Sequence, residues 1–338
     1  MKLTISLTVR SGGYLLACRR ALVLAASLLM AAGLMSAPNF ARAEFPDHPI
    51  TLVVPYGAGA SIDAVARSLA QGAQKRLGQS VVVENRTGAG GALGATYVGR
   101  KPADGYTIAI VSNNPFVLGR FSNSMQMDPV TDFTHIITVT GSLVAVAVRT
   151  DSKIKNIKEL LEAARKEPGK LTYSTSGTAS TGFLNMEEFA ALANIKVQHV
   201  PYKSGAEAVT AILSGQVDFY SDAAWGPFAR DGRLRPLLLI ADKRISQYPD
   251  VPIPTDIVSA QVHPGEFLLV GPKGLQPAVL QRLHDAFKET LSDPEFLKMQ
   301  NNFNMNPVYR GPEATRDAIA TLVPPLQKMF NTLNLGVQ

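Results

Sequence analysis

Short apolar runs alternate with longer segments in which apolar residues recur at helical spacing. Residues 50–54 form a near-continuous apolar run that predicts a strand. Residues 61–77 place apolar side chains at helical spacing, and Gly78 ends that pattern. Further strands are predicted at 81–83 and 106–111, with a glycine-rich turn and a helix between them. This alternation predicts parallel β-α-β units and hence an α/β fold.

The pattern restarts after residues 134–148, a long β-rich stretch that we interpret as a strand crossing between two lobes. Asn156 with Glu159, and Ser204 with Glu207, have the spacing of helix N-terminal caps. Predicted strands follow at 171–175, 195–200, 217–220, 236–241 and 267–270, and predicted helices at 277–291 and 312–333. We therefore expect lobe 1 to comprise 44–145 and 244–338, and lobe 2 to comprise 146–243.

Residues 1–43 differ from the rest of the chain. They contain five basic residues and no acidic one, an apolar run over 21–35, and the small-x-small sequence Ala41-Arg42-Ala43. This order predicts a secretory signal peptide and a periplasmic protein. Arg19-Arg20 leaves the twin-arginine route open beside the expected Sec route. Lipidation at Cys18 is disfavoured because the apolar run follows this cysteine instead of preceding it.

Charge and composition exclude several classes of function. The chain has 33 basic and 27 acidic residues, but 28 and 27 remain without the predicted signal, so nothing indicates a nucleic-acid partner. The single cysteine also lies in the signal, which excludes disulfide and thiolate chemistry in the mature part. The five histidines show no metal-ligand spacing. We therefore expect no metal, no cofactor and no catalytic residue.

Two sequence patterns suggest enzymes only weakly. The stretch "GAGGALG" at 88–94 resembles a dinucleotide loop, but its third glycine comes one position late. The stretch from Gly177 to Gly182 is one residue too long for a nucleophile elbow around Ser180. A serine hydrolase using Ser180 remains the less favoured alternative, because no His or Asp partner is positioned by the sequence.

Three strand-loop-helix junctions are rich in small and hydroxyl residues: "PYGAGASIDAVAR" at 55–67, "STSGTASTGF" at 174–183 and "VPYKSGAEA" at 200–208. A helix N-terminus carries unpaired N–H groups and partial positive charge, so it attracts carboxylates. The alternative is that Ser61 and Asp63 only cap their helix. If the lobes face each other, these junctions meet in one crevice at the carboxyl ends of the strands, where open α/β sheets bind ligands.

These stretches, together with "VVVENRTGAGGALGA", "KPADGYTIAI", "EPGKLTYSTSG", "VPYKSGAEAVTAILSGQVDFYSD" and "YPDVP", resemble the Bug-type receptors of tripartite tricarboxylate transporters over the whole mature chain. The resemblance implies a two-lobed, type II periplasmic binding protein of the Venus-flytrap kind, with mixed β-sheets flanked by helices. It implies a monomer that closes on a small organic acid, a di- or tricarboxylate or an aromatic carboxylate, and delivers it to membrane permease subunits.

The resemblance also implies a set of ligand-binding residues. In the family, backbone N–H groups and ordered water hold the ligand carboxylates. Asp63 matches an acidic residue of the family, which the resemblance implies orders the loop or a bridging water. The residues at matching positions are Tyr56, Ala58, Ala60, Ser61 and Asp63 in the first loop, Ser176, Thr178, Ala179, Ser180 and Thr181 in the second, and Lys203 and Asp222 at the crevice edge. The alternative for Lys203 is a solvated surface lysine. Asn113 and Asn114 follow the third predicted strand and are further candidates to line the cleft, with a simple turn as the alternative.

The chain departs from the family pattern in ways that make the pocket less polar. Ala60 replaces a usual glycine, Ile62 a small polar residue, and Gly182-Phe183 a frequent Ser-His pair. With the unique Trp225 near the expected rim, these changes suggest an aromatic or partly apolar acid. The alternative is that Phe183 and Trp225 pack inside lobe 2.

The sequence therefore predicts a solute-binding receptor that does no chemistry on its ligand. A ligand sensor that docks on a signalling partner is a further alternative, which the sequence does not separate from transport.

Overall fold

The computed structural model describes residues 45–122, 124–178, 180–259 and 262–333. The signal peptide expected over 1–43, its cleavage site and Cys18 lie outside the described residues. Among the described residues, no helix is both long and apolar enough to cross a bilayer.

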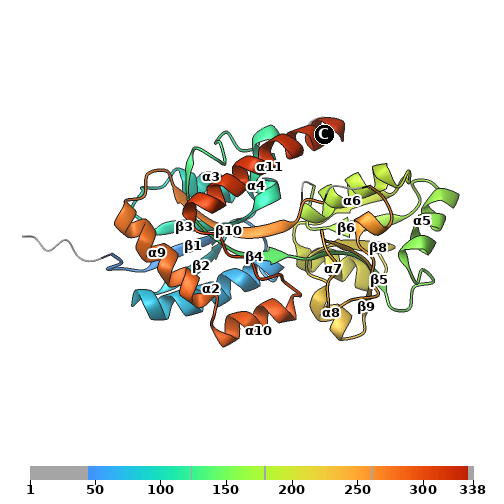
Figure 1. Cartoon of the computed structure of the whole chain (residues 1–338), viewed down its shortest axis with the longest axis horizontal. Coiled ribbons are helices and arrows are strands. Elements are labelled where there is room, and N and C mark those ends of the chain that lie inside the picture. Colours follow the sequence, from blue (N-terminus) through green and yellow to red (C-terminus); the bar gives the residue numbers. More distant parts are fainter. Residues whose placement is uncertain (1–44, 123, 179, 260–261, 334–338) are drawn as a thin grey trace, which may run out of the picture. The chain divides into compact units, whose positions relative to one another are not determined.

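Five strands form a first, mixed sheet in the order β2-β1-β3-β10-β4 (Figure 1). Strand β1 runs parallel to β2 and to β3, whereas β10 runs antiparallel to β3 and to β4. The strands are β1 (Ile50–Val54), β2 (Val81–Asn85), β3 (Thr107–Ser112), β4 (Phe133–Ser142) and β10 (Gly265–Pro272).

Alternating side chains of this sheet reach two helical layers. Leu52 and Ile110 pack in one apolar cluster, and their neighbours Val53 and Val111 pack in another on the opposite face. The first cluster is covered by α2 (Ser61–Leu77), α9 (Pro277–Thr290) and α10 (Pro294–Asn302), and the second by α3 (Ala92–Gly99), α4 (Asn113–Phe121) and α11 (Pro312–Thr332). Both faces of the inner strands β1, β3 and β10 are buried, as their near-continuous apolar runs predict, whereas Val82 of the edge strand β2 is exposed.

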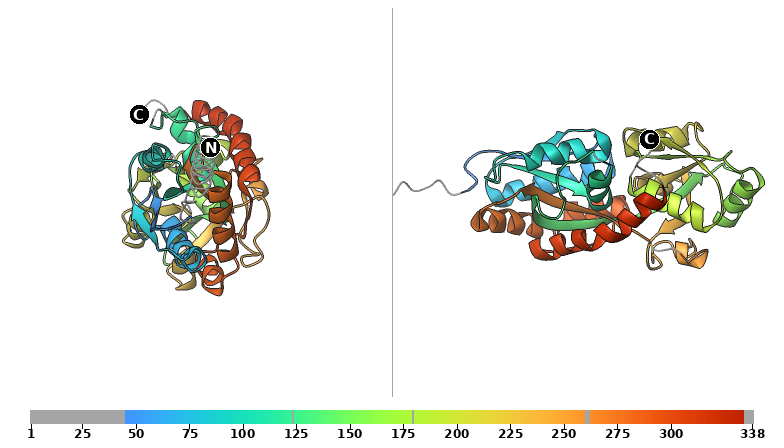
Figure 2. Two further views of the ribbon diagram at one scale, coloured as in Figure 1. Left: turned by 90° about the vertical axis from the view of Figure 1, so that its left-hand side faces the viewer. Right: turned by 90° about the horizontal axis from the view of Figure 1, so that it is seen from above.

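A second mixed sheet has the order β7-β6-β8-β5-β9. Here β6 is parallel to β7 and β8, and β5 is antiparallel to β8 and β9. The strands are β5 (Val144–Arg149), β6 (Thr172–Thr175), β7 (Gln198–Pro201), β8 (Phe219–Asp222) and β9 (Leu234–Ile240), flanked by α5 (Ile157–Lys166), α6 (Thr181–Leu192), α7 (Gly205–Leu213) and α8 (Gly226–Arg230). The right-hand view of Figure 2 shows helices beside this sheet. The expected α/β class with mixed sheets is confirmed.

Helix starts follow the predicted capping residues. The side chains of Asn156 and Ser204 accept hydrogen bonds from the N–H groups of Glu159 and Glu207, and so cap α5 and α7. The structure also contains helices that the sequence patterns did not predict. Helix α4 begins at Asn113 and contains Gly119, and α10 begins at Pro294, directly after Asp293. These turn-forming residues obscured the helical spacing of both helices.

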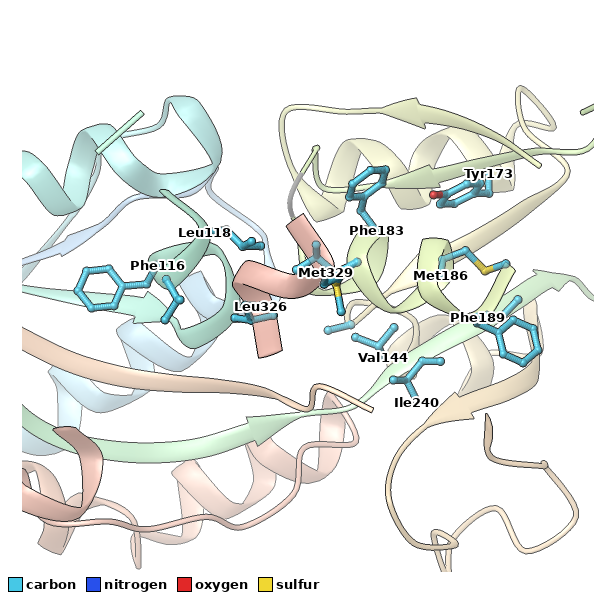
Figure 3. Close-up of a cluster of buried hydrophobic side chains, with 14 of the residues drawn as sticks. Phe116, Leu118, Val144, Tyr173, Phe183, Met186, Phe189, Ile240, Leu326 and Met329 are labelled. Atoms are coloured by element: carbon cyan, nitrogen blue, oxygen red, sulfur yellow. The ribbon is translucent and has the colours of Figure 1, made fainter. Parts of the chain in front are cut away.

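The polypeptide passes from one sheet to the other directly between β4 and β5, and returns through residues 241–264. The apolar core is continuous across this junction. Leu326 and Met329 of α11 belong to the same buried cluster as Phe116 of the first sheet's helical layer and Phe183 of α6 (Figure 3). The end of α11 therefore packs against helices that flank both sheets.

Candidate ligand-binding cavity

A small cavity lies where three helix starts meet. Its volume is about 60 Å³, several times the ~10–15 Å³ that one water molecule needs, so it suits a small molecule. The β1–α2, β6–α6 and β7–α7 junctions provide most of its wall. The lining residues are Tyr56, Ala60, Ser61, Ile62, Gly90, Ser112, Pro115, Ser142, Ser176, Thr178, Ser180, Thr181, Lys203, Ser204, Gly205, Asp222, Ala223, Ala224 and Phe267.

Of these three helix starts, that of α2 has no side-chain cap. Its N-cap residue is Ala60, which has no side-chain oxygen, and no side-chain cap is formed. The first N–H groups of a helix have no partner within the helix, and Ser61 and Ile62, which carry them here, are both buried and line the cavity. The sequence therefore leaves unpaired donors and the positive end of a 17-residue helix directed at the cavity wall.

The Asp63 carboxylate fixes the conformation of the β1–α2 loop through hydrogen bonds. Its carboxylate accepts hydrogen bonds from the Gly59 N–H (3.0 Å), from Arg67 Nε (3.0 Å) and Nη2 (3.1 Å), and from Asn85 Nδ2 (2.9 Å). Burial alone would raise the pKa of Asp63, but the hydrogen bonds from Arg67, Gly59 and Asn85 together lower it. Asn85 also donates to the Tyr56 carbonyl (3.0 Å), so strand β2 fixes both ends of the loop.

Asp222 holds the β6–α6 loop in a similar way. It ends β8, and its carboxylate accepts hydrogen bonds from the Ser176 N–H (2.7 Å) and Oγ (2.6 Å) and from the Ala223 N–H (2.8 Å). Burial raises the pKa of Asp222, against the hydrogen bonds from Ser176 and Ala223, which lower it. Helix α2 and strand β8 thus each supply a buried aspartate that orients one loop of the cavity wall.

The starts of α6 and α7 are capped by their own serines. Ser180 Oγ accepts a hydrogen bond from the Phe183 N–H (3.2 Å), and Ser204 Oγ accepts one from the Glu207 N–H (3.2 Å). These caps engage the third N–H group of α6 and α7, as the Ala60 carbonyl does for the Asp63 N–H in α2 (3.0 Å). Among the described residues, the first two N–H groups of each helix therefore have no acceptor, and α2 differs in having no side-chain cap. The Ser180 hydroxyl is a helix cap here, which does not favour the serine hydrolase alternative.

The described lining residues include two charged side chains, the exposed Lys203 and the buried Asp222. The remaining wall combines serine and threonine hydroxyls with apolar groups such as Ile62, Pro115 and Phe267. Such a wall offers neutral donors to an anion and apolar surface to a short carbon chain.

The structure brings most of the predicted residues together and separates others from the cavity. Ala58 is exposed and outside the lining, and Ala179 lies outside the described residues. The side chain of Asp63 points into its loop. Those that do line the cavity are Tyr56, Ala60, Ser61, Ser176, Thr178, Ser180, Thr181, Lys203 and Asp222.

Asn113 does not line the cavity, contrary to expectation. Its Nδ2 donates to the Pro264 carbonyl (3.1 Å), and its Oδ1 accepts from the Asn114 (2.8 Å) and Glu266 (3.0 Å) N–H groups. This side chain therefore joins the start of α4 to the approach to β10, and its polar atoms are occupied by the protein.

The expectation of an aromatic rim is wrong for the two residues that suggested it. Trp225 is fully buried, with its indole N–H donating to the Leu143 carbonyl (2.8 Å) and its ring packed edge-on against Tyr248. Phe183 is buried and contacts the His199 ring at 4.5 Å. Both belong to buried clusters that include residues of the second sheet, where their apolar area is removed from water, and neither lines the cavity.

The glycine-rich loop at 88–94 serves a packing role. A Cβ at Gly91 would lie 2.9 Å from the Tyr56 hydroxyl, and one at Gly94 would lie 2.6 Å from Pro55 Cβ. The loop thus lies close against the β1–α2 junction, and it also lines a wider outer pocket of about 560 Å³ that shares Tyr56, Gly90, Ser176, Thr178 and Lys203 with the inner cavity.

Several lining residues escaped the sequence reasoning. Ser112 and Ser142 end strands of the first sheet, and Phe267 lies on β10, far along the chain. Only Ser204 had a recognisable signal, the capping box. Among the described residues, no group of three or more His, Cys, Asp or Glu side chains is arranged to hold a metal ion.

Comparison with known proteins gives consistent results. The model of the tripartite tricarboxylate transporter family receptor matches residues 65–335. A Cupriavidus necator relative, "UPF0065 protein in gbd 5'region", is 37% identical over 313 residues, 92% of this chain and 95% of its own. The structure of the periplasmic binding protein BugD is similar, with 28% identity, a TM-score of 0.80, and 86% of this chain and 99% of BugD covered. An R. palustris protein with adipate gives 26% identity and a TM-score of 0.79, covering 86% and 98%.

Proposed function

The chain belongs to the tripartite tricarboxylate transporter receptor family, and from this premise we propose that its cavity binds a small organic carboxylate through the start of α2. The observation that carries this proposal is the uncapped first turn of α2 in the cavity wall. A ligand carboxylate would accept the hydrogen bonds of the Ser61 and Ile62 N–H groups and would interact favourably with the helix dipole.

The residues that line the cavity also favour one class of organic acid as the ligand. Apolar side chains such as Ile62 and Pro115 suit a short aliphatic chain, and Trp225 and Phe183, which suggested an aromatic ligand, do not line the cavity. One similar structure, that of the R. palustris protein, contains adipate, a flexible dicarboxylate. We therefore propose an aliphatic dicarboxylate as the ligand, with Tyr56, Ala60, Ser61, Ser176, Thr178, Ser180, Thr181, Lys203 and Asp222 around it.

We further propose that the receptor acts in the periplasm after Sec export and delivers its ligand to membrane permease subunits. The proposed lobes are 44–145 with 244–338, and 146–243, and closure of one lobe on the other would enclose the acid. The family membership supports transport over signalling, because its model describes a transporter receptor. We propose that the protein does no chemistry on its ligand and acts as a monomer.

Two substitutions at Ser61 test the role of the α2 amides. Ser61→Pro removes an N–H group at a position where proline fits a helix, and the extended conformation of Ala60 (φ −69°, ψ 160°) is compatible with a following proline. Ser61→Ala, the matched control, removes the hydroxyl and keeps the N–H. Because a hydrogen bond to a charged group contributes about 1.5–3 kcal/mol, Ser61→Pro should weaken binding by roughly 10- to 100-fold, and Ser61→Ala by much less.

The measurement is isothermal titration of residues 44–338 with succinate, adipate and benzoate, with circular dichroism to confirm that each variant folds. Adipate or succinate should bind more tightly than benzoate. Failure of all three acids to bind, or equal affinity of Ser61→Pro and the wild type, would contradict the proposal.

A further inference from the structure

The buried Asp222 is an unusual component of a cavity that is proposed to bind an anion. Its residue is 7% exposed, it lines the cavity, and it follows directly from strand β8. An ionised aspartate at this place would repel a ligand carboxylate, and in a cavity removed from water such repulsion is weakly screened.

No cation compensates Asp222 among the described residues. Its three hydrogen bonds come from the neutral Ser176 and Ala223 groups, and no described Lys, Arg or His side chain lies within salt-bridge distance. Asp63 provides the contrast within the same protein, because Arg67 pairs with both of its oxygens. The two loop-holding aspartates therefore differ in the charge that faces them.

The other titratable groups around Asp222 do not neutralise the charge of its carboxylate. Tyr56, a half-buried residue of the β1–α2 junction, and Tyr220, a buried residue of β8, both have a phenol pKa that is raised by burial, so they are neutral near pH 7. Lys203, from the β7–α7 junction, is the remaining charged residue of the lining, and it is exposed to solvent. Burial also raises the pKa of Asp222 itself.

Asp222 has a free acceptor position for a proton. Oδ2 accepts the two hydrogen bonds of Ser176, whereas Oδ1 accepts the single one of the Ala223 N–H. A carboxylate oxygen has two lone pairs, so Oδ1 retains one. A proton there would convert a group that repels the ligand into one that donates a hydrogen bond to it.

We propose that the cavity takes up its carboxylate ligand together with one proton from solvent, which is held on Asp222. This inference rests on the proposed function and specifies how the same site accommodates the charge of its ligand. The neutral Asp222 then donates a hydrogen bond to the ligand carboxylate while it keeps accepting the hydrogen bonds of Ser176. Because one proton enters with the ligand, the added proton cancels one of the ligand's negative charges.

Proton uptake is measured directly by titrating the protein with adipate, and separately with succinate, at pH 7.5 in two buffers of different ionisation enthalpy, Hepes and Tris. At this pH the free acids are ionised, because ordinary carboxyl pKa values lie near 4. We expect uptake of up to one proton per ligand. By linkage, the dissociation constant should then rise with pH above 7, by up to about tenfold per unit.

Asp222→Asn tests the residue itself. Asparagine keeps a hydrogen-bond acceptor for Ser176 and offers an amide N–H in place of the acid proton, but its Nδ2 does not accept the hydrogen bond of the Ala223 N–H. This variant should bind without proton uptake, with an affinity independent of pH between 7 and 8.5, and more tightly than the wild type at pH 8.5. The matched control is Glu188→Gln, another carboxyl whose pKa is raised by burial, which lies outside the inner cavity and should leave proton uptake unchanged.

The outcomes separate the two proposals. Binding without proton uptake in the wild type overturns this inference and leaves the carboxylate receptor standing, as does uptake that persists in Asp222→Asn. If neither acid binds, the proposed dicarboxylate function fails and this inference fails with it. If Asp222→Asn does not fold, the proton count of the wild type still decides.

Discussion

At the scale of single residues, the neighbours of an ionisable group decide how it behaves once it is buried. Asp63 and Asp222 both orient loops of the cavity, but only Asp63 has an arginine partner, and their pKa values move in opposite directions. Asp63 therefore acts as a fixed structural charge, because its lowered pKa keeps it ionised. His135 on β4 differs from both aspartates, because it is buried and no oppositely charged side chain pairs with it.

His135 should make the protein sensitive to acid. Burial lowers its pKa from 6.5 to about 4, and among the described residues its Nε2 has no hydrogen-bond partner. The folded state thus favours the neutral ring, so its contribution to stability is present above pH 6.5 and is lost as the pH falls toward 4. By linkage this loss amounts to at most about 3 kcal/mol.

Urea unfolding at pH 7.5 and pH 5 measures the effect. The free energy of unfolding of His135→Gln should fall less between these two pH values than that of the wild type. His199 and His263, whose pKa values are also lowered by burial, should keep part of the dependence. An unchanged difference in the variant would show that His135 does not contribute.

At the scale of elements, close packing of α6 on β8 places the second loop against Asp222. A Cβ at Gly182 would lie 2.0 Å from the Ser221 carbonyl oxygen and 2.9 Å from Asp222 Cα. The glycine at position 182 is therefore matched to the short distance between this helix and strand.

Gly182→Ala should destabilise the protein by about 1–3 kcal/mol, because backbone atoms must move to admit the methyl group. Gly205→Ala is the matched control, since a Cβ in the first turn of α7 would make an ordinary 3.6 Å contact with Ala224. Thermal or urea unfolding compares the two. Equal stability of both variants would show that α6 can shift away from β8 at little cost.

Elements with local signals were predictable, and contacts made across the chain were not. Helix α2 was predicted over 61–77 because its apolar spacing and the left-handed Gly78 after it are local features. The loops of the cavity were predictable for the same reason. The partners of Asn113, in contrast, are Pro264 and Glu266, about 150 positions away, and nothing near Asn113 in the sequence specifies them.

At the scale of the whole molecule, the cavity depends on close approach between the β1–α2 loop and the start of α7. A Cβ at Gly57 would lie 2.8 Å from Ser204 Cβ. Gly57 is not among the glycines with positive φ, so alanine fits its backbone conformation. The requirement for glycine here therefore arises from the contact between the two loops.

Gly57→Ala should hold these loops apart and weaken adipate binding several-fold, with little change in the free energy of unfolding. Ala58→Ser is the control, because Ala58 is exposed and outside the cavity lining, and it should leave both quantities unchanged. Calorimetry with adipate and urea unfolding provide the two measurements. A stability loss that parallels the affinity loss would indicate a general folding defect.

The alanine that precedes α2 has a consequence for the protein before any metabolite arrives. The amides of Ser61 and Ile62 have no acceptor among the described residues, so they should exchange their hydrogens with deuterated solvent faster than the hydrogen-bonded amides further along α2. An arriving acid would then complete a piece of secondary structure that the polypeptide alone leaves unfinished, and slowed exchange at these two amides would report that the receptor is loaded.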